Sequence, residues 1–307
     1  MAASHGIASI PDMSNDQRIR VFRRTFVAQG ESEAMEVDAY AITTERFLIL
    51  CDTLLCPEDM AQVMQEIQGA LAGRQLLVTN SHADWDHAWG NGYFTGTHAV
   101  PIIAHHHCRE RLLSDEARTG LADFQQRDQT FSNTTLTPPT ITFSDTLTIS
   151  GGDLTLELIP APGHHRDHIA IWLPELRLLL AFDAVENLIP IIENAEAVES
   201  MLATLERLLK LQPQRVLCSH GKTTSIDTVK RNLAYLREVE RRSRDALAAR
   251  PGYRPSQAEL EEGSGLINYP FDEVSAGSVE FADSKFYRWV HNHNVRCIVQ
   301  WLMNRTG

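Results

Sequence analysis

The chain lacks a long apolar run: no stretch approaches the roughly 18 to 20 consecutive apolar residues of a membrane span. Residues 1 to 20 also contain no apolar core of signal-peptide length. Cysteine is scarce, and the five cysteines are scattered without any C-x-x-C spacing. An odd, dispersed set of this kind suits a reducing compartment better than a disulfide framework. We therefore expect a cytoplasmic protein with no membrane partner.

Positive charge is also in short supply. The chain has 28 lysines and arginines against 40 aspartates and glutamates, a formal net charge of −12. This balance disfavours nucleic acid as a partner, because binding to phosphate backbones depends on basic patches. A bound metal can still create a local positive site in an acidic protein. We therefore expect a small-molecule substrate and no nucleic acid.

What the chain does have is a mixture of strand and helix patterns over 307 residues, of which 43% are hydrophobic. Alternating apolar residues and helical spacing between turn signals define the expected elements. Strands are expected at 20–27, 36–43, 46–52, 76–79, 100–104, 146–149, 154–159, 169–173, 176–182 and 215–218, and helices at 57–71, 107–126, 195–211, 226–249 and 284–303. We expect three parts: a polar N-terminal segment (1–19), a catalytic domain (20–225) and a C-terminal helical extension that packs on it (226–307).

The segment from Ser81 to His87 places four metal-ligand side chains within six residues, directly after the strand expected at 76–79. They are His82, Asp84, Asp86 and His87. A divalent cation accounts for two imidazoles and two carboxylates in one short loop, because both are good ligands for zinc or iron. The alternative is a solvated polar loop rich in His and Asp.

The same arrangement recurs at the ends of later strands. His164 follows the strand expected at 154–159, Asp183 directly follows the one at 176–182, and His220 follows the one at 215–218. Strand ends that share one edge of a sheet present their loops to a common crevice. Four strand ends that all carry metal-compatible residues predict a metal site at this edge.

These segments resemble the metallo-β-lactamase superfamily in order and spacing. The resemblance covers residues 20–225 and rests on the H-x-D-x-D-H segment 82–87, on P-G-H-H-R-D-H at 162–168, on Phe182-Asp183 and on S-H-G at 219–221. It implies an α/β fold, a four-layer αββα sandwich with appended C-terminal helices. It also implies a one- or two-metal site at one edge of the sandwich.

Carried over residue by residue, the resemblance implies two divalent metal ions. The first would be bound by His82, Asp84 and His164, the second by Asp86, His87 and His220, with Asp183 bridging both. Asp86 is also the family's candidate for the catalytic residue that orients the attacking water and passes its proton.

Asp84 departs from the family pattern, which more often has H-x-H-x-D-H. Four His and three Asp carry a formal charge of −3, against −2 for the usual five His and two Asp. Such a centre should be a weaker Lewis acid. Zinc remains the expected metal, and the harder oxygen donor makes iron or manganese the alternatives. The flavodiiron branch also has a carboxylate here, but this chain has no segment patterned as a flavodoxin domain.

The resemblance implies a hydrolase in which a hydroxide held by two metals cleaves a small ester, lactone, thioester or β-lactam. A phosphodiesterase of the same fold is one alternative. A diiron oxidoreductase, suggested by Asp84, is another. The last alternative is a non-catalytic metal-binding sensor.

Four further residues are candidates around the site. Asp52 and His168 are expected to support the ligands from behind. In the last helix Tyr287, His291 and Asn294 share one face, and Tyr287 or His291 is the candidate for substrate binding. The alternative is a docked helix whose His makes internal hydrogen bonds. This aromatic-rich helix is also a candidate interface for a homodimer.

Other conspicuous residues have simpler interpretations. The run His105-His106-His107 is expected to be a polar strand-to-helix junction, with one imidazole near the pocket as the alternative. His165 lies beside His164, but the family pattern puts the ligand directly after glycine. Cys218, Trp85 and Trp89 are expected to be core residues, with substrate stacking as the alternative for the tryptophans.

Overall fold

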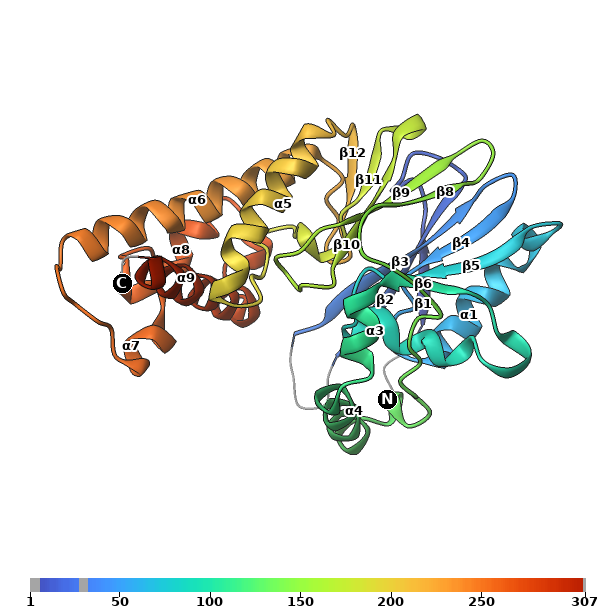
Figure 1. The fold of residues 1–307 in the computed structure, drawn as a ribbon, viewed down its shortest axis with the longest axis horizontal. Coiled ribbons are helices and arrows are strands. Elements are labelled where there is room, and N and C mark those ends of the chain that lie inside the picture. Colours follow the sequence, from blue (N-terminus) through green and yellow to red (C-terminus); the bar gives the residue numbers. More distant parts are fainter. Residues whose placement is uncertain (1–5, 28–32, 306–307) are drawn as a thin grey trace. The chain divides into compact units, whose positions relative to one another are not determined.

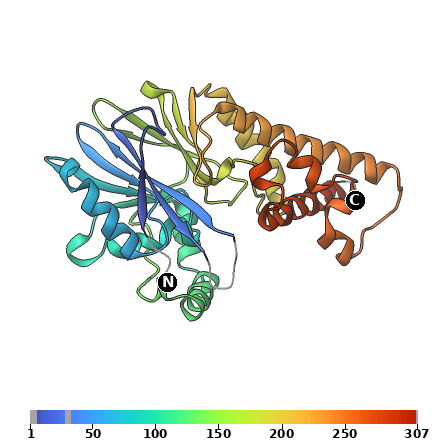
Figure 2. The ribbon, with the colours of Figure 1, turned by 180° about the vertical axis from the view of Figure 1, so that it is seen from behind.

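The structure is a computed structural model that describes residues 6–27 and 33–305. The chain divides into two compact units that it enters alternately (Figures 1 and 2). The first unit contains the chain up to Pro160, Asp167–Phe182 and Gln214–Thr224. The second contains Ala161–Arg166, Asp183–Pro213 and the chain from Ser225 onward.

The first unit contains two sheets. The larger has seven strands in chain order, antiparallel from β1 to β4 and parallel from β4 to β7. These are β1 (Ile7–Ile10), β2 (Ile19–Phe26), β3 (Met35–Thr43), β4 (Phe47–Cys51), β5 (Gln75–Thr79), β6 (Ile102–His105) and β7 (Ile141–Phe143). Because β4, β5 and β6 are parallel, the loops that follow them leave from the same edge of the sheet.

The smaller sheet has five strands in the order β12-β11-β10-β9-β8, and only the β11–β12 pair is parallel. They are β8 (Leu147–Ser150), β9 (Thr155–Pro160), β10 (Ile169–Leu173), β11 (Leu178–Leu180) and β12 (Arg215–Leu217). Leu180 pairs with Leu217 in the parallel register, so the segments that carry Asp183 and His220 begin side by side.

Strand alternation divides the apolar side chains of the larger sheet between two cores. In β3, Tyr40 and Ile42 pack with residues of the smaller sheet, whereas Ala39 and Ala41 belong to the core on the other face. Successive strand residues point to opposite faces, so one strand supplies both layers. The two sheets of this unit therefore pack face to face.

Helices of the first unit cover the outer face of the larger sheet. They are α1 (Pro57–Ile67), α2 (Trp85–Ala88), α3 (His106–Leu112) and α4 (Asp115–Arg127). Buried side chains of α1 and α3, Met60 and Cys108 among them, belong to the same core as Ala39. The single helix expected at 107–126 is instead two, because the Ser114 side chain accepts a hydrogen bond from the Ala117 amide and starts α4.

The second unit is helical in the described residues. It contains α5 (Val198–Lys210), α6 (Ile226–Ala248), α7 (Gln257–Glu262), α8 (Phe271–Val274) and α9 (Lys285–Arg305). Helix α6 packs against both α5 and α9. Among the helices of the described residues, none is both long and apolar enough to cross a membrane.

Short 3₁₀ helices link several elements. They are Gln68–Leu71, Trp89–Tyr93, Gly96–His98, Gln129–Phe131, Pro174–Leu176, Phe182–Ala184, Ala195–Ala197, Ser264–Leu266 and Val279–Phe281. The strands and long helices lie close to their expected positions. The strand Ile7–Ile10 was not expected, because it lies in the segment interpreted as polar, and neither were β7, α7 and α8.

Candidate metal centre

The loop after β5 is held from behind by Asp52, which follows β4. Asp52 is fully buried, and its carboxylate accepts hydrogen bonds from the Ser81 amide (2.6 Å), the Ser81 hydroxyl (2.7 Å) and Nδ1 of His87 (2.9 Å). Burial raises the pKa of Asp52, while His87 and Ser81 act in the opposite direction. These are the contacts that a supporting role for Asp52 requires.

Four histidines proposed as ligands have the same hydrogen-bonding pattern. In each, Nδ1 has a partner within its own unit: Ser81 Oγ for His82 (2.9 Å), Asp52 for His87 (2.9 Å), the Ile191 carbonyl for His164 (3.3 Å) and the Glu36 carbonyl for His220 (2.7 Å). Ser81 donates its own proton to Asp52, so its oxygen accepts from His82. A proton fixed on Nδ1 leaves the lone pair of Nε2 for a metal.

In the first unit the Nε2 atoms lie near carboxylates of the same loop. His82 Nε2 lies 3.5 Å from Asp84, and His87 Nε2 lies 3.6 Å from Asp86. His220 Nε2 lies 3.5 Å from the other oxygen of Asp86. One ligand atom from each of Asp86, His87 and His220 lies within 4.8 Å of the other two.

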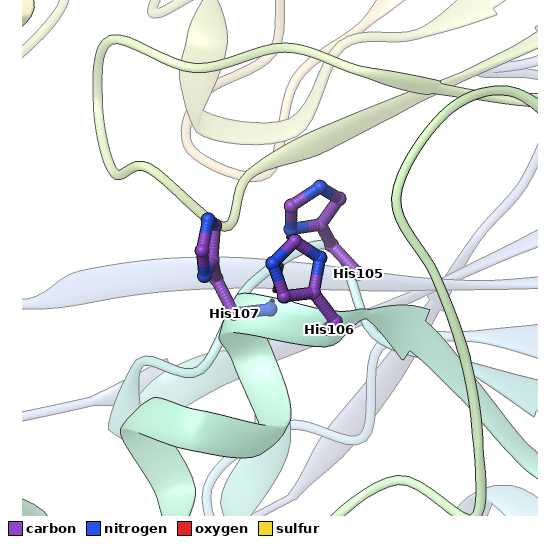
Figure 3. Close-up of side chains that lie close together, drawn as sticks. All are labelled: His105, His106 and His107. Carbon is purple, nitrogen blue, oxygen red and sulfur yellow. Dashed lines mark hydrogen bonds between the residues drawn. The ribbon is translucent and has the colours of Figure 1, made fainter.

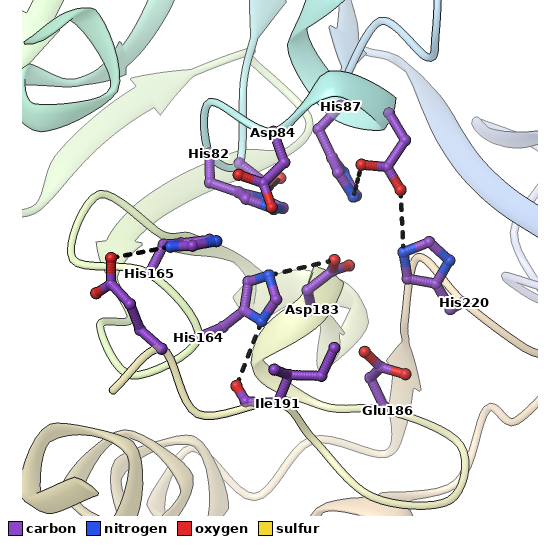
Figure 4. A network of polar contacts seen from close by, with 12 residues as sticks. His82, Asp84, His87, His164, His165, Asp183, Glu186, Ile191 and His220 are labelled. Atoms are coloured by element: carbon purple, nitrogen blue, oxygen red, sulfur yellow. Dashed lines mark hydrogen bonds and ion pairs between the residues drawn. The ribbon is translucent and has the colours of Figure 1, made fainter. Parts of the chain in front are cut away.

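In the second unit, His164 and Asp183 form a similar pair, with 3.7 Å between Nε2 and the carboxylate (Figure 4). The residue before His164 must be glycine. Gly163 has a φ of +142°, and a Cβ there would lie 2.5 Å from the Cα of Met201. The residue before Asp183 is Phe182, a bulky side chain at a φ of +48°. Strained backbone of this kind is typical of functional sites.

These four nitrogen–oxygen distances fit a shared metal better than hydrogen bonds. A hydrogen bond between nitrogen and oxygen is usually about 2.7 to 3.2 Å long. Two ligand atoms each about 2.0 to 2.2 Å from a tetrahedral metal lie about 3.3 to 3.6 Å apart. The observed 3.5 to 3.7 Å is close to the second value. Imidazole nitrogen and carboxylate oxygen also form the donor set of a divalent zinc or iron site.

Arg111 was not predicted from the sequence as part of the site. It lies in α3 and contacts Asp84 in the loop after β5. Its guanidinium donates to Asp84 at 2.5 Å and to Asp167 at 2.6 Å. Burial lowers the pKa of Arg111, but attraction to the two carboxylates outweighs burial, and the net pKa is raised. The second oxygen of Asp167 accepts the Ala83 amide at 2.9 Å. The only sequence signal was indirect: an extra carboxylate at Asp84 calls for a cation.

The sequence model of the metallo-beta-lactamase superfamily matches residues 33–220. The chain belongs to the metallo-beta-lactamase superfamily. Its two sheets and their helices match the metallo-beta-lactamase sandwich with appended C-terminal helices, which confirms the predicted fold class.

Solved structures of metallo-beta-lactamases share this fold at low sequence identity. One from Pontibacter korlensis is 17% identical with a TM-score of 0.59, covering 76% of this chain and 99% of that chain. IND-7 is 15% identical with a TM-score of 0.58, covering 76% and 98%. FIM-1 from Pseudomonas aeruginosa, in its mono-zinc form, is 15% identical with a TM-score of 0.54, covering 74% and 93%. No protein of curated function matches the chain.

The two residues of α9 predicted to bind substrate, Tyr287 and His291, make hydrogen bonds within the second unit. His291 is fully buried: Nδ1 is 3.0 Å from the Tyr235 hydroxyl, and Nε2 is 2.7 Å from the Tyr269 carbonyl. The Tyr287 hydroxyl donates to Glu186 at 2.9 Å. These contacts favour the alternative of a docked helix with an internally bonded histidine.

The face of α9 that includes these residues holds the segment after Asp183. Asn294 donates to the Pro190 carbonyl at 2.7 Å and accepts from the Ile192 amide at 3.0 Å. From α6, Asn232 accepts from the Glu186 amide and donates to its carbonyl. The sequence placed Asn294 on this face without assigning it a partner, because its contacts lie about a hundred residues away.

Two other histidines of the 162–168 segment have separate positions. His168 is fully buried, and its ring centroid lies 5.0 Å from that of His82, which fits a supporting position. His165 lies 3.0 Å from Glu193 through Nδ1. The two rings thus have contacts of their own, which agrees with assigning the ligand role to His164.

The run His105-His106-His107 crosses from β6 into α3: His105 ends the strand, and His106 and His107 begin the helix (Figure 3). His105 accepts the His107 amide through Nδ1 as the helix cap, and its Nε2 lies 3.1 Å from the Ser144 carbonyl. His107 Nδ1 lies 2.7 Å from Glu110. Although the three imidazoles lie close enough to hold a metal, both nitrogens of His105 already have partners. The structure favours the polar strand-to-helix junction.

Trp89 and Cys218 are buried in the core, and Trp85 is partly buried and packs against it. Trp85 and Trp89 both make ring contacts with Phe124 and Phe131. Cys218 is buried with a relative exposure of 1%. The core interpretation is confirmed for Trp89 and Cys218, and the ring contacts of Trp85 favour it for that residue.

Proposed function

We propose that this protein is a metal-dependent hydrolase with a dinuclear centre, in which His82, Asp84 and His164 hold one cation and Asp86, His87 and His220 the other, with Asp183 bridging. The observation that carries the proposal is the 3.5 to 3.7 Å spacing of the His–Asp pairs. Zinc is the proposed metal, with iron or manganese as alternatives because of Asp84. The mono-zinc form of FIM-1 supports zinc and makes the number of bound metals a quantity to measure.

The protein's own groups then have distinct tasks. Two bound cations would polarise the carbonyl or phosphoryl oxygen of the substrate and lower the pKa of a water. The histidines bind through Nε2, because hydrogen bonds at Nδ1 fix their orientation. Asp86, whose two oxygens face His87 and His220, orients the attacking water and passes its proton. Asp52 fixes the position of His87 from behind.

The proposed substrate is a small ester, lactone, thioester or β-lactam. Metal analysis of protein purified without added metal, combined with a hydrolysis panel of these four classes and a phosphodiester, tests the proposal. Turnover of one of the four with bound zinc is the expected result. Exclusive cleavage of the phosphodiester, two redox-active irons without hydrolysis, or bound metal without any turnover would favour the phosphodiesterase, the oxidoreductase or the sensor respectively.

Asp86→Asn should reduce turnover by a factor of about 100 or more while leaving the fold intact, because an amide cannot accept the proton from water. Turnover on the best substrate and the thermal melting curve are measured together. Asp115→Asn, at an exposed position of the same unit, is the matched control and should retain full activity. Full activity of Asp86→Asn would contradict the catalytic assignment.

The remaining proposals concern partners and location. We propose a cytoplasmic enzyme that does not bind nucleic acid or membranes, in keeping with its net charge of −12. A homodimer through the last helix is also proposed. The half-exposed rings of Phe286 and Trp289 on α9 support it, and light scattering of Trp289→Ala tests it.

A further inference from the structure

Arg111 joins two carboxylates beside the first ligand loop. One arm of its guanidinium donates to Asp84 and the other to Asp167, at 2.5 and 2.6 Å. A guanidinium usually binds both oxygens of one carboxylate through its fork. Here the fork is divided between two residues that are 83 positions apart in the sequence. Each carboxylate therefore keeps one oxygen for another partner.

The second oxygens are used in ways that connect Arg111 to the ligand loop. That of Asp167, which is fully buried, accepts the amide of Ala83 at 2.9 Å, directly between His82 and Asp84. That of Asp84 lies 3.5 Å from Nε2 of His82, the separation of two ligands on one metal. The backbone and the side chain of this loop are thus both fixed from α3 and Asp167.

We propose that Arg111 is a positioning residue that holds Asp84 as a single-oxygen ligand of the first metal and offsets the charge of this extra carboxylate. The inference rests on the proposed metal centre. The single positive charge of Arg111 is shared between Asp84 and Asp167, so it offsets part of the charge that Asp84 adds relative to the neutral histidine usual at this position. Arg111 thereby makes the aspartate compatible with the rest of the ligand set.

The effect of Arg111 should depend on which residue occupies position 84. With Asp84, loss of the guanidinium leaves two carboxylates close together and frees Asp84 to rotate. With a histidine at position 84, the guanidinium would keep its bond to Asp167 but would face a neutral ring beside a cation, so its effect through residue 84 would be repulsion. A double-mutant cycle between the two positions therefore separates positioning of Asp84 from general support of the fold.

The cycle compares wild type, Arg111→Met, Asp84→His and the double variant. Zinc per chain is measured by elemental analysis and zinc affinity by competition with a chromophoric chelator. Arg111→Met should weaken one of the two zinc equivalents by about 10- to 100-fold, the usual loss when a partner of a metal ligand is removed. In the Asp84→His background the same change should alter affinity by less than about threefold. Arg109→Met, also on α3 but bonded to the Pro139 carbonyl, is the control and should bind zinc as wild type does.

Unchanged zinc binding by Arg111→Met, or an equal loss in both backgrounds, would overturn the inference. Should Arg111→Met fail to fold, the comparison of Asp84→His with the double variant still decides. Weaker binding by the double variant would then count against the inference, and equal or tighter binding would support it.

Failure of the inference is distinguishable from failure of the proposed function. If the wild-type protein binds two zinc ions but hydrolyses no substrate, the hydrolase proposal is rejected. The zinc affinities of the four variants would still test the role of Arg111. Normal hydrolysis with zinc binding that does not depend on Arg111 would reject only the inference. Wild-type protein that binds no metal would reject both.

Discussion

At the scale of single residues, the fixed histidine orientation depends most on one buried carboxylate. Asp52 receives three hydrogen bonds, from two groups of Ser81 and from His87. Asp52→Asn should lower metal affinity by about 10- to 100-fold, because the amide no longer offers an anionic acceptor to Nδ1 of His87. Chelator competition measures the loss.

Asp59 provides the matched control for Asp52. It is also a buried carboxylate, and it pairs with Arg24 at 3.0 Å. Burial raises the pKa of both aspartates. Asp59→Asn should cost about 3 kcal/mol of unfolding free energy, because it leaves Arg24 buried without its anion, yet metal affinity should stay unchanged. Equal affinity losses in the two variants would mean that Asp52 acts through stability alone.

The sequence could predict the proposed ligands but not the groups that hold them. The ligands occur in short segments, such as residues 82–87, whose residue types already imply a metal. The contacts of Arg111 with Asp84 and Asp167 join three distant segments and have no spacing that a sequence pattern could reveal. Only the unbalanced charge at Asp84 gave an indirect signal for a cation.

At the scale of elements, α9 has a clearer role than its composition suggested. Asn294 of this helix makes hydrogen bonds to the backbone on both sides of Ile191. The Ile191 carbonyl in turn accepts a hydrogen bond from Nδ1 of His164. The helix therefore supports a proposed ligand through the intervening segment. The sequence suggested that the face shared by Tyr287, His291 and Asn294 contacts substrate. Its observed hydrogen bonds instead support the fold.

Asn294→Ala should lower the free energy of unfolding by about 2 kcal/mol or more, because it leaves the Ile192 amide and the Pro190 carbonyl buried without their partner. Metal affinity should fall as well, since His164 loses its fixed acceptor. Chemical denaturation and chelator competition measure the two effects. Asn304→Ala, at an exposed position of α9, should stay within about 0.5 kcal/mol of wild type. If Asn294→Ala is destabilised but its metal affinity is unchanged, α9 does not support metal binding.

Element prediction failed where local pattern was weakest. Strand β1 has only four residues, two of them exposed, and pairs along the edge of β2, so its sequence carries little apolar alternation. Helices α7 and α8 are one or two turns long and lie in a segment rich in turn residues. Long periodic segments such as α6 were predicted to within a residue, because their buried stripe repeats over many turns.

At the scale of the whole molecule, the chain passes between its two units at residues 160, 166, 182, 213 and 224. A continuous catalytic domain at 20–225 stays a prediction, and this path argues that such a fragment would lack necessary partners. Helix α5 belongs to the unit that also includes α6 and α9, and α6 packs on it. Truncation after residue 225 would remove the helix that packs on α5, whose buried apolar side chains include Leu205 and Leu208.

We therefore expect a fragment of residues 1–225 to aggregate or to show no cooperative melting transition, because buried apolar surface contributes about 25 cal/mol per Å² and α5 would lose its covering helix. The full chain should melt in a single transition, since neither unit is one continuous segment that can unfold without the other's connections being released. Calorimetry of the fragment and of the full chain measures their melting transitions, and limited proteolysis compares how well each is folded. A soluble fragment with a sharp transition at the temperature of the full chain would show instead that residues 226–307 are a dispensable extension, and that α5 is stabilised by the preceding chain alone.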